Sequence, residues 1–189
     1  MHQTFGKSTV RGTVTTIIEK PKITIFTVAT SRKTGSVDFP RFIVFKDQSE
    51  TRVDFAVGDR ITVEAHFFTS KKHPEGTLVP DTISVERSKL DAVFAGEQFL
   101  LDENIFAIRG VIAVDVYAPA DNIALTSIII QSGEYKSFIP IVAFNTAASA
   151  LKQKEKGNLV NVIGYVQTKP ASEVKNYSHT QSFVVTAIR

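Results

Sequence analysis

The sequence contains no cysteine and no tryptophan, and its uninterrupted apolar runs are short. Without cysteine the chain can form neither disulfides nor a thiolate metal site, which excludes a small disulfide-stabilised secreted scaffold. Runs such as Phe42–Phe45 and Ile128–Ile130 fall far short of the roughly 18 residues that span a bilayer, so we predict no membrane helix. Residues 1–10 lack the apolar segment of a signal peptide. Together these absences predict a cytoplasmic protein.

Motifs that would carry catalysis are also missing. The four histidines lie far apart, at positions 2, 66, 73 and 179, and none belongs to a metal-binding frame such as His-Glu-x-x-His. The sequence has no glycine-rich phosphate loop, no dinucleotide-binding glycine motif and no Gly-x-Ser-x-Gly elbow. We therefore predict that the protein is not an enzyme and holds no metal and no cofactor.

The charge that is present is distributed unevenly. The net charge is only +3, too small by itself to indicate a nucleic-acid-binding protein. Residues 1–88 hold 13 Lys and Arg against 10 Asp and Glu, whereas residues 89–189 hold 9 against 9. The whole basic excess therefore lies in the first half of the chain.

Three short motifs recur in the same order in both halves, at an offset of 98 or 99 residues. Val10–Val14 matches Ile108–Ile112, Phe42–Phe45 matches Ile141–Phe144, and Gly58–Val63 matches Gly157–Val162. One such match between β-rich segments arises by chance, but three in order at a nearly constant offset favour an internal duplication.

Within each copy, five runs rich in Val, Ile, Thr and Phe are separated by turn-forming residues, a pattern typical of strands. In the first copy the expected strands are Thr9–Glu19, Ile23–Thr30, Phe39–Phe45, Arg60–Thr69 and Thr77–Val85. In the second copy they are Ile105–Val116, Ala124–Gln131, Ser137–Phe144, Leu159–Gln167 and Ser182–Ile188. A helix is expected between the third and fourth strands of each copy, over Asp47–Phe55 and Thr146–Lys156. The second helix would have Thr146 as its N-cap and would end before Gly157.

Five strands with a helix between the third and the fourth have the connectivity of the OB-fold, a small Greek-key barrel, although other five-stranded barrels remain open. We therefore predict an all-β protein with short helices, built from two tandem five-stranded OB-fold barrels over residues 1–88 and 105–189. Gly12 and Gly110 are expected to let the first strand of each barrel bend. The segment between the barrels, 89–104, is too apolar for a flexible linker and is expected to pack between them.

Both copies resemble the bacterial and phage single-stranded-DNA-binding proteins. The first copy carries Arg11–Val14, Phe26–Ser31, Phe39–Phe45 and Gly58–Ala65. These segments are similar to the family's Arg-Gly-x-Val, Thr-x-Ala-Thr, aromatic-x-Arg-Val-Val-x-Phe and Gly-Asp-x-Val-x-Val-x-Gly motifs. The second copy keeps the last family glycine as Gly164. The ordered set of motifs carries the resemblance, since no single motif is highly specific.

The resemblance implies two base-stacking aromatic residues on the third strand of each copy: Phe39 and Phe45, then Phe138 and Phe144. Side chains alternate between the faces of a strand, so one face carries Phe39, Arg41, Ile43 and Phe45, and the other carries Phe42 and Val44. An outward face with two rings and a guanidinium suits a single strand, because rings stack on any base and Arg pairs with phosphate. A strand apolar on both faces can also be buried on both, so packing remains the alternative, more strongly in the second copy, which has no arginine there.

Loop residues are expected to support these strands. They are Arg32, Lys33, Lys71 and Lys72 in the first copy, and Tyr135, Lys136 and Tyr177 in the second. They lie in the loops from which OB-folds reach around a bound strand. Each residue alone is also typical of an ordinary solvated surface.

We therefore predict sequence-independent binding of single-stranded DNA in DNA replication, recombination or transfer, with RNA left open. Family members gather four barrels, so the resemblance implies that a chain with two barrels forms a homodimer. The sequence ends in the fifth strand of the second copy, without the acidic tail by which cellular members recruit partner proteins. That difference implies a phage or mobile-element version. The rival hypothesis is an OB-fold protein-interaction module of a replication or transfer complex, whose outward rings contact protein.

Overall fold

The computed structural model describes residues 3–47, 51–70, 73–86, 101–132, 135–170 and 179–189. Within these ranges the chain forms twelve strands and one helix. The strands of the first half are β1 (Phe5–Glu19), β2 (Ile23–Ser31), β3 (Val37–Asp38), β4 (Arg41–Phe45), β5 (Arg60–Ser70) and β6 (His73–Val85). The second half contains β7 (Glu103–Ile112), β8 (Tyr117–Ala120), β9 (Ile123–Ser132), β10 (Tyr135–Phe144), α2 (Asn145–Lys152), β11 (Leu159–Pro170) and β12 (His179–Ile188).

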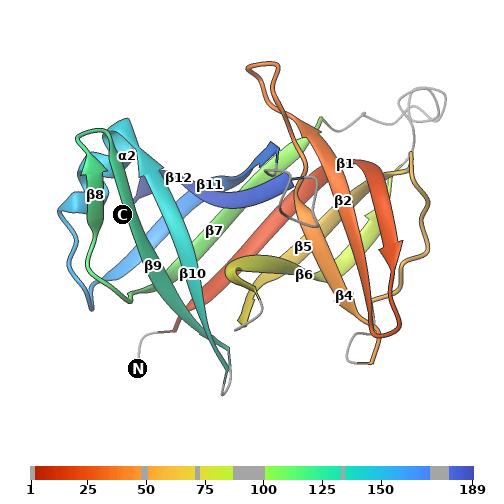
Figure 1. The fold of residues 1–189 in the computed structure, drawn as a ribbon, viewed down its shortest axis with the longest axis horizontal. Coiled ribbons are helices and arrows are strands. Elements are labelled where there is room, and N and C mark those ends of the chain that lie inside the picture. The colour runs from red at the N-terminus through yellow and green to blue at the C-terminus, as the bar shows by residue number, and fades with distance from the viewer. Residues whose placement is uncertain (1–2, 48–50, 71–72, 87–100, 133–134, 171–178) are drawn as a thin grey trace.

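Each half closes into a five-stranded barrel (Figure 1). In the first half β1 pairs with both β2 and β5, while β4 pairs with β2 and, in parallel, with β6, which returns to β5. The second half repeats this ring through β7, β9, β10, β12 and β11. This strand order, with a single parallel pair in each ring, is that of the OB-fold. The predicted fold class is therefore confirmed.

The turn that precedes the fourth strand of each barrel is the same in both halves. Gly58 and Gly157 have φ values of +98° and +92°, a region that favours glycine. Each glycine donates its N–H to the first strand of its own barrel, Gly58 to the Val14 carbonyl and Gly157 to the Ile112 carbonyl, both at 2.9 Å. These matching turns support the internal duplication that the repeat offset predicts.

Gly12 and Gly110 lie where the first strand of each barrel leaves one partner strand and joins another. In the first barrel this exchange occurs at Thr13, which pairs with both β5 and β2. A Cβ on Gly12 would lie 2.0 Å from the Ala29 carbonyl oxygen, and one on Gly110 would lie 2.5 Å from the Ile129 carbonyl oxygen. Close approach of a neighbouring backbone is therefore what requires glycine at both bends.

The third strand of the first barrel is shorter than predicted. It was expected over Phe39–Phe45, but regular pairing begins at Arg41, and Val37–Asp38 forms the separate strand β3. Pro40 has no N–H to donate to a strand ladder, although its carbonyl accepts the Val28 N–H at 3.1 Å. The short strand β8, which the sequence pattern did not predict, extends the sheet beyond β9 in the second half.

The helix of the second barrel forms, but its predicted N-cap is wrong. The helix begins at Asn145, with Phe144 at the N-cap position and no side-chain capping bond, so Thr146 lies inside the helix. It ends at Lys152, four residues earlier than predicted. Its buried Leu151 packs against the barrel core, so α2 closes this end of the second barrel.

The predicted helix of the first barrel is wrong in its described residues, 47 and 51–55, which form no helix. Val53 and Phe55 are two positions apart, a spacing that places both side chains on one side of an extended segment. Both pack against the core, and the Phe55 ring meets Phe26 edge-on with centroids 5.0 Å apart. An extended segment therefore closes the first barrel where a helix closes the second.

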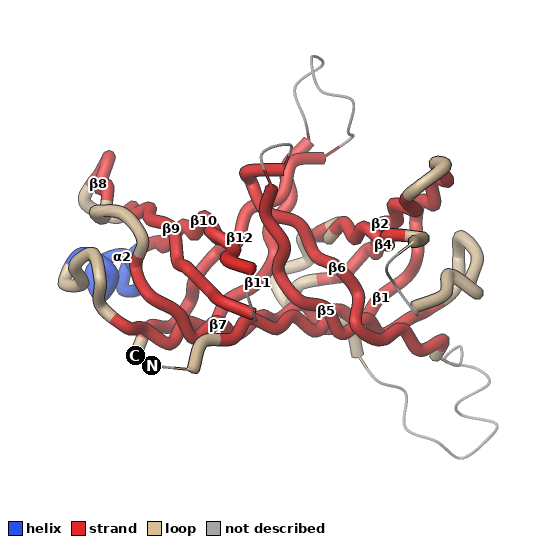
Figure 2. The backbone as a smooth tube through the Cα atoms, turned by 90° about the horizontal axis from the view of Figure 1, so that it is seen from below, coloured by secondary structure: helices blue, strands red, loops and turns tan. Residues whose placement is uncertain are grey.

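β1 and β7 pair antiparallel and join the two barrels into one twelve-stranded sheet. Figure 2 shows the two halves at opposite ends of the molecule. Within the β1–β7 pair Ser8 lies opposite Phe106, which is 98 residues later in the chain. The internal repeat relates these two strands by the same offset of 98, so Ser8 and Phe106 are equivalent residues of the two copies. Two equivalent residues therefore lie opposite each other in an antiparallel pair. The two halves are therefore related by an approximate two-fold axis at this pair.

The hydrophobic core is continuous across this junction. Phe67 of β5, Phe106 of β7 and Phe183 of β12 are each no more than 3% exposed. Their rings meet edge-on, with centroids 4.9 to 5.9 Å apart. Because Phe67 comes from the first half and the other two from the second, the burial of each ring depends on both halves.

Residues just before β7 bind back to the first barrel. The Asp102 carboxylate accepts the Ser31 N–H at 2.8 Å and Arg60 Nη1 at 2.6 Å. Burial opposes the ionisation of Asp102, but these two partners outweigh it and lower its pKa below the ordinary value. Residues 101–102 therefore belong to a contact with the first barrel, whereas residues 89–100 of the expected packed linker lie outside the described residues.

We expect Asp102→Asn to lower the free energy of unfolding at pH 7 by about 1 to 2 kcal/mol, because it removes a charged hydrogen-bond acceptor and an ion pair. A carboxyl whose pKa is lowered by folding stabilises the fold above its unfolded-state pKa of about 3.9, and this stabilisation is lost as the pH falls through the folded-state value. The difference between variant and wild type in urea unfolding should therefore shrink as the pH falls below about 3.9. Asp115→Asn, at an exposed position, is the control. An equal loss of unfolding free energy at pH 7 and at low pH would contradict a stabilising role for the ionised Asp102 carboxylate.

Candidate nucleic-acid interface

The third strand of the first barrel alternates as predicted. Phe42 and Val44 lie in the core, so Arg41, Ile43 and Phe45 face the other way. We call Phe39, Arg41, Ile43 and Phe45 the first strip. Its middle is not open to solvent, because Arg41 is only 8% exposed and Ile43 is buried beside its cross-strand partner Ile25. Phe39 and Phe45, at the two ends of the strip, are half-buried and lie outside the core.

Arg41 differs most from its predicted setting. Its backbone N–H donates to Gln181 Oε1 of the second barrel at 3.1 Å, and its guanidinium lies 3.9 Å from the Glu75 carboxylate. The Gln181 side chain also donates to the Gly76 carbonyl at 3.3 Å. The first strip therefore adjoins β12 of the other barrel at this point.

Phe45 is paired with a ring that the sequence analysis did not select. Its ring meets Phe68 of β5 edge-on, with centroids 5.5 Å apart. Phe68 is half-buried and follows the core residue Phe67 on the same strand, so it faces away from the core. Strand alternation around Phe67 was the signal that could have identified it. The two rings together form an aromatic surface at one end of the first strip.

The corresponding strip of the second barrel is more open. Phe138 is 49% exposed, while Val142 and Phe144 on the same face of β10 are half-buried. Cross-strand pairing places Leu125 beside Val142 and Tyr117 beside Leu125, and Tyr117 is 67% exposed. We call these five residues the second strip. Tyr117 was missed because its strand, β8, was not predicted.

The loop residues fall into three groups. Arg32 is bound to Asp38 through two nitrogen–oxygen contacts, the longer at 2.7 Å, and lies 4.7 Å from the ring centroid of Tyr165 in the second barrel. The hydrogen bonds that Arg32 donates to the Asp38 carboxylate raise the pKa of Arg32. Lys33, Tyr135 and Lys136 are exposed. The remaining predicted residues, Lys71, Lys72 and Tyr177, lie outside the described residues.

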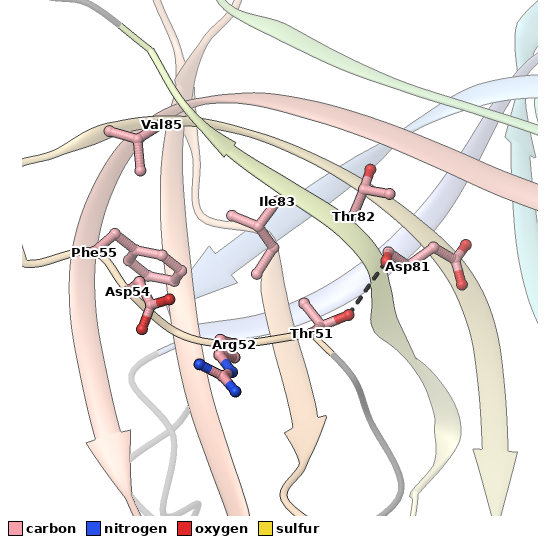
Figure 3. Close-up of a pocket in the computed structure, with 8 residues that line it drawn as sticks. All are labelled: Thr51, Arg52, Asp54, Phe55, Asp81, Thr82, Ile83 and Val85. Atoms are coloured by element: carbon pink, nitrogen blue, oxygen red, sulfur yellow. Dashed lines mark hydrogen bonds between the residues drawn. The ribbon is translucent and has the colours of Figure 1, made fainter.

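A pocket of about 420 Å³ opens beside the segment that closes the first barrel (Figure 3). It is lined by Thr51, Arg52, Asp54, Phe55, Asp81, Thr82, Ile83 and Val85. One arginine and two aspartates give this lining charges of both signs, which does not favour a polyanion. No residue of either strip is among these lining residues, so the pocket is separate from the strips.

Two further features bear on function. Across the described ranges, no three His, Asp or Glu side chains come together as metal ligands. No helix in the described part of the chain is long and apolar enough to cross a membrane.

The chain matches no protein-family model and no curated protein. Among solved structures it is similar to the wild-type single-stranded DNA binding protein from Thermus aquaticus, with a TM-score of 0.66 and 13% identity over 100% of this chain and 93% of that chain. A deletion mutant of the same protein gives a TM-score of 0.65 and 14% identity, covering 100% and 95% of the two chains. The chain therefore shares, over its whole length, the fold of a single-stranded-DNA-binding protein, as the sequence motifs predict.

Proposed function

We propose that the protein binds single-stranded DNA without reading its sequence, by stacking bases on the two strips. The observation that supports this most is the second strip, where Phe138 and Tyr117 expose much of their rings on one face of the β8–β9–β10 sheet. Contiguous apolar surface on a soluble protein marks a place where a partner binds. The similarity to the Thermus aquaticus protein over the whole chain adds to this proposal.

The chemistry of the strips suits a single strand. Aromatic rings stack on any base at about 1 to 3 kcal/mol each, so binding tolerates all sequences. A duplex hides the faces of its bases, and rings fixed on a strand have no access to them. Lys33 and Lys136 are exposed and form no ion pair among the described residues, so both can neutralise phosphates.

The proposal predicts a preference for the single strand and a marked salt dependence. We expect oligo-dT of about 30 nucleotides, long enough for two barrels, to bind more tightly than a duplex of equal length. The logarithm of its binding constant should fall with the logarithm of salt concentration, with a slope of about −0.7 per neutralised phosphate. Titration of labelled DNA at two salt concentrations measures both. Absence of binding at low salt would remove the proposal and favour the protein-interaction module.

We further infer that the protein acts without catalysis or cofactor, in replication, recombination or transfer of DNA, and that it forms a homodimer. The sequence resemblance supports each of these predictions. The domain division at residues 88 and 105 also stays a prediction.

A further inference from the structure

A matched pair of hydrogen bonds links the third strand of each barrel to the fourth strand of the other. The Phe39 N–H donates to Thr168 Oγ1 at 2.8 Å, and the Phe138 N–H donates to Thr69 Oγ1 at 2.9 Å. Phe138 lies 99 residues after Phe39, and Thr168 lies 99 residues after Thr69, which is the repeat offset of these strands. The approximate two-fold axis therefore produces the same contact twice.

Both N–H groups lie beyond the residues through which the third strand pairs with the fifth strand of its own barrel. Phe39 precedes β4, which pairs with β6 at Phe42. Phe138 precedes the residues of β10 that pair with β12, Ile141–Ala143. In each barrel a threonine of the opposite barrel supplies an acceptor for this backbone N–H. The backbone of Phe39 and that of Phe138 are thus each held by the other half of the molecule.

A second hydrogen bond stabilises the contact at Thr168. The Thr168 N–H donates to Oδ1 of Asp38 at 2.9 Å, and Asp38 is fully buried and bound to Arg32. Residues 38 and 39 are therefore joined to Thr168 by two bonds that run in opposite directions. At the equivalent place in the second barrel, Ser137 replaces Asp38. The Thr69 contact consequently has no buried carboxylate behind it.

We infer that Thr69 and Thr168 are positioning residues, which hold the two strips in one fixed arrangement so that a single strand is bound across both barrels as one composite site. This inference rests on the proposed function. The threonine hydroxyls act through the backbone of Phe39 and Phe138, whose rings stack on bases. A strand long enough to reach both strips gains from their fixed arrangement, whereas a strand that covers one strip does not.

The test compares two lengths of labelled oligo-dT, about 8 nucleotides for one barrel and about 30 for both. Thr168→Val and Thr69→Val remove the acceptor oxygen and keep the side-chain shape. We expect each variant to lower the affinity for the long oligomer by about threefold to tenfold and to change that for the short one by less than about twofold. Thr168→Ser should restore the wild-type ratio. Thr186→Val is the matched control, because its hydroxyl donates to the Ile163 carbonyl within the same barrel.

An unchanged ratio of long to short affinity in both valine variants would overturn the inference. So would an equal loss for both lengths together with a lower melting temperature, because that result indicates a structural role alone. If Thr168→Val fails to fold, Thr69→Val carries the test, since no buried carboxylate depends on Thr69. Wild-type protein that binds neither oligomer would refute the proposed function itself, and is distinguishable from these outcomes.

Discussion

Replacing Phe67 with alanine is expected to lower the free energy of unfolding by about 3 to 5 kcal/mol and to destabilise both barrels together. Phe67 is buried between Phe106 and Phe183, which belong to the other half of the chain. Its removal leaves a cavity at the junction, so the second barrel loses packing as much as the first. A single unfolding transition should therefore persist at a lower denaturant concentration.

The positions of the tyrosines allow unfolding of the second barrel to be followed separately from unfolding of the whole chain. All four lie in the second half, at positions 117, 135, 165 and 177, and the chain has no tryptophan. Tyrosine fluorescence therefore reports on the second barrel, while far-UV circular dichroism reports on both. In Phe67→Ala the two midpoints should fall together. Phe5→Ala, at a ring 47% exposed on β1, is the control and should cost much less. A fluorescence midpoint that stays at the wild-type value would show that the barrels unfold independently.

Replacing Phe45 and Phe138 together with alanine is expected to weaken binding of oligo-dT by roughly 30-fold or more. The estimate follows from about 1 to 3 kcal/mol for each stacked ring, with one ring removed from each strip. Because Phe138 is half exposed and Phe45 lies outside the core, the melting temperature should change little. Fluorescence anisotropy with labelled DNA and a thermal melt of the same samples measure the two quantities.

Phe5→Ala is again the matched control, since its exposure equals that of Phe138 within a few per cent but it lies outside both strips. It should leave the affinity for DNA unchanged. If the double variant bound as tightly as the wild type, the strips would not be the stacking surface. If its melting temperature collapsed, the two rings would instead be structural.

The features that follow from local patterns were predictable. The repeat offset, the glycine turns at Gly58 and Gly157, and the alternation around Phe42 depend on neighbouring residues in the sequence, and the structure contains all of them. The predicted helix over 47–55 is wrong in its described residues, because the spacing of Val53 and Phe55 suits an extended segment.

What the sequence did not predict depends on contacts between the halves. Arg41 is buried beside Gln181, and Arg32 lies against Tyr165, because the approximate two-fold axis brings distant strands together. The threonine contacts at Phe39 and Phe138 have the same origin. No pattern within one copy specifies how that copy meets the other.

The approximate two-fold axis also bears on strand direction. A nucleic-acid strand has a direction, from its 5′ end to its 3′ end. A two-fold axis turns the second barrel around, so a strand that runs straight across both strips meets the two barrels in opposite orientations. One continuous strand must therefore lie 5′ to 3′ along one barrel and 3′ to 5′ along the other, unless it doubles back between them. Flat rings accept either orientation of a base, so the proposed stacking on both strips tolerates this reversal.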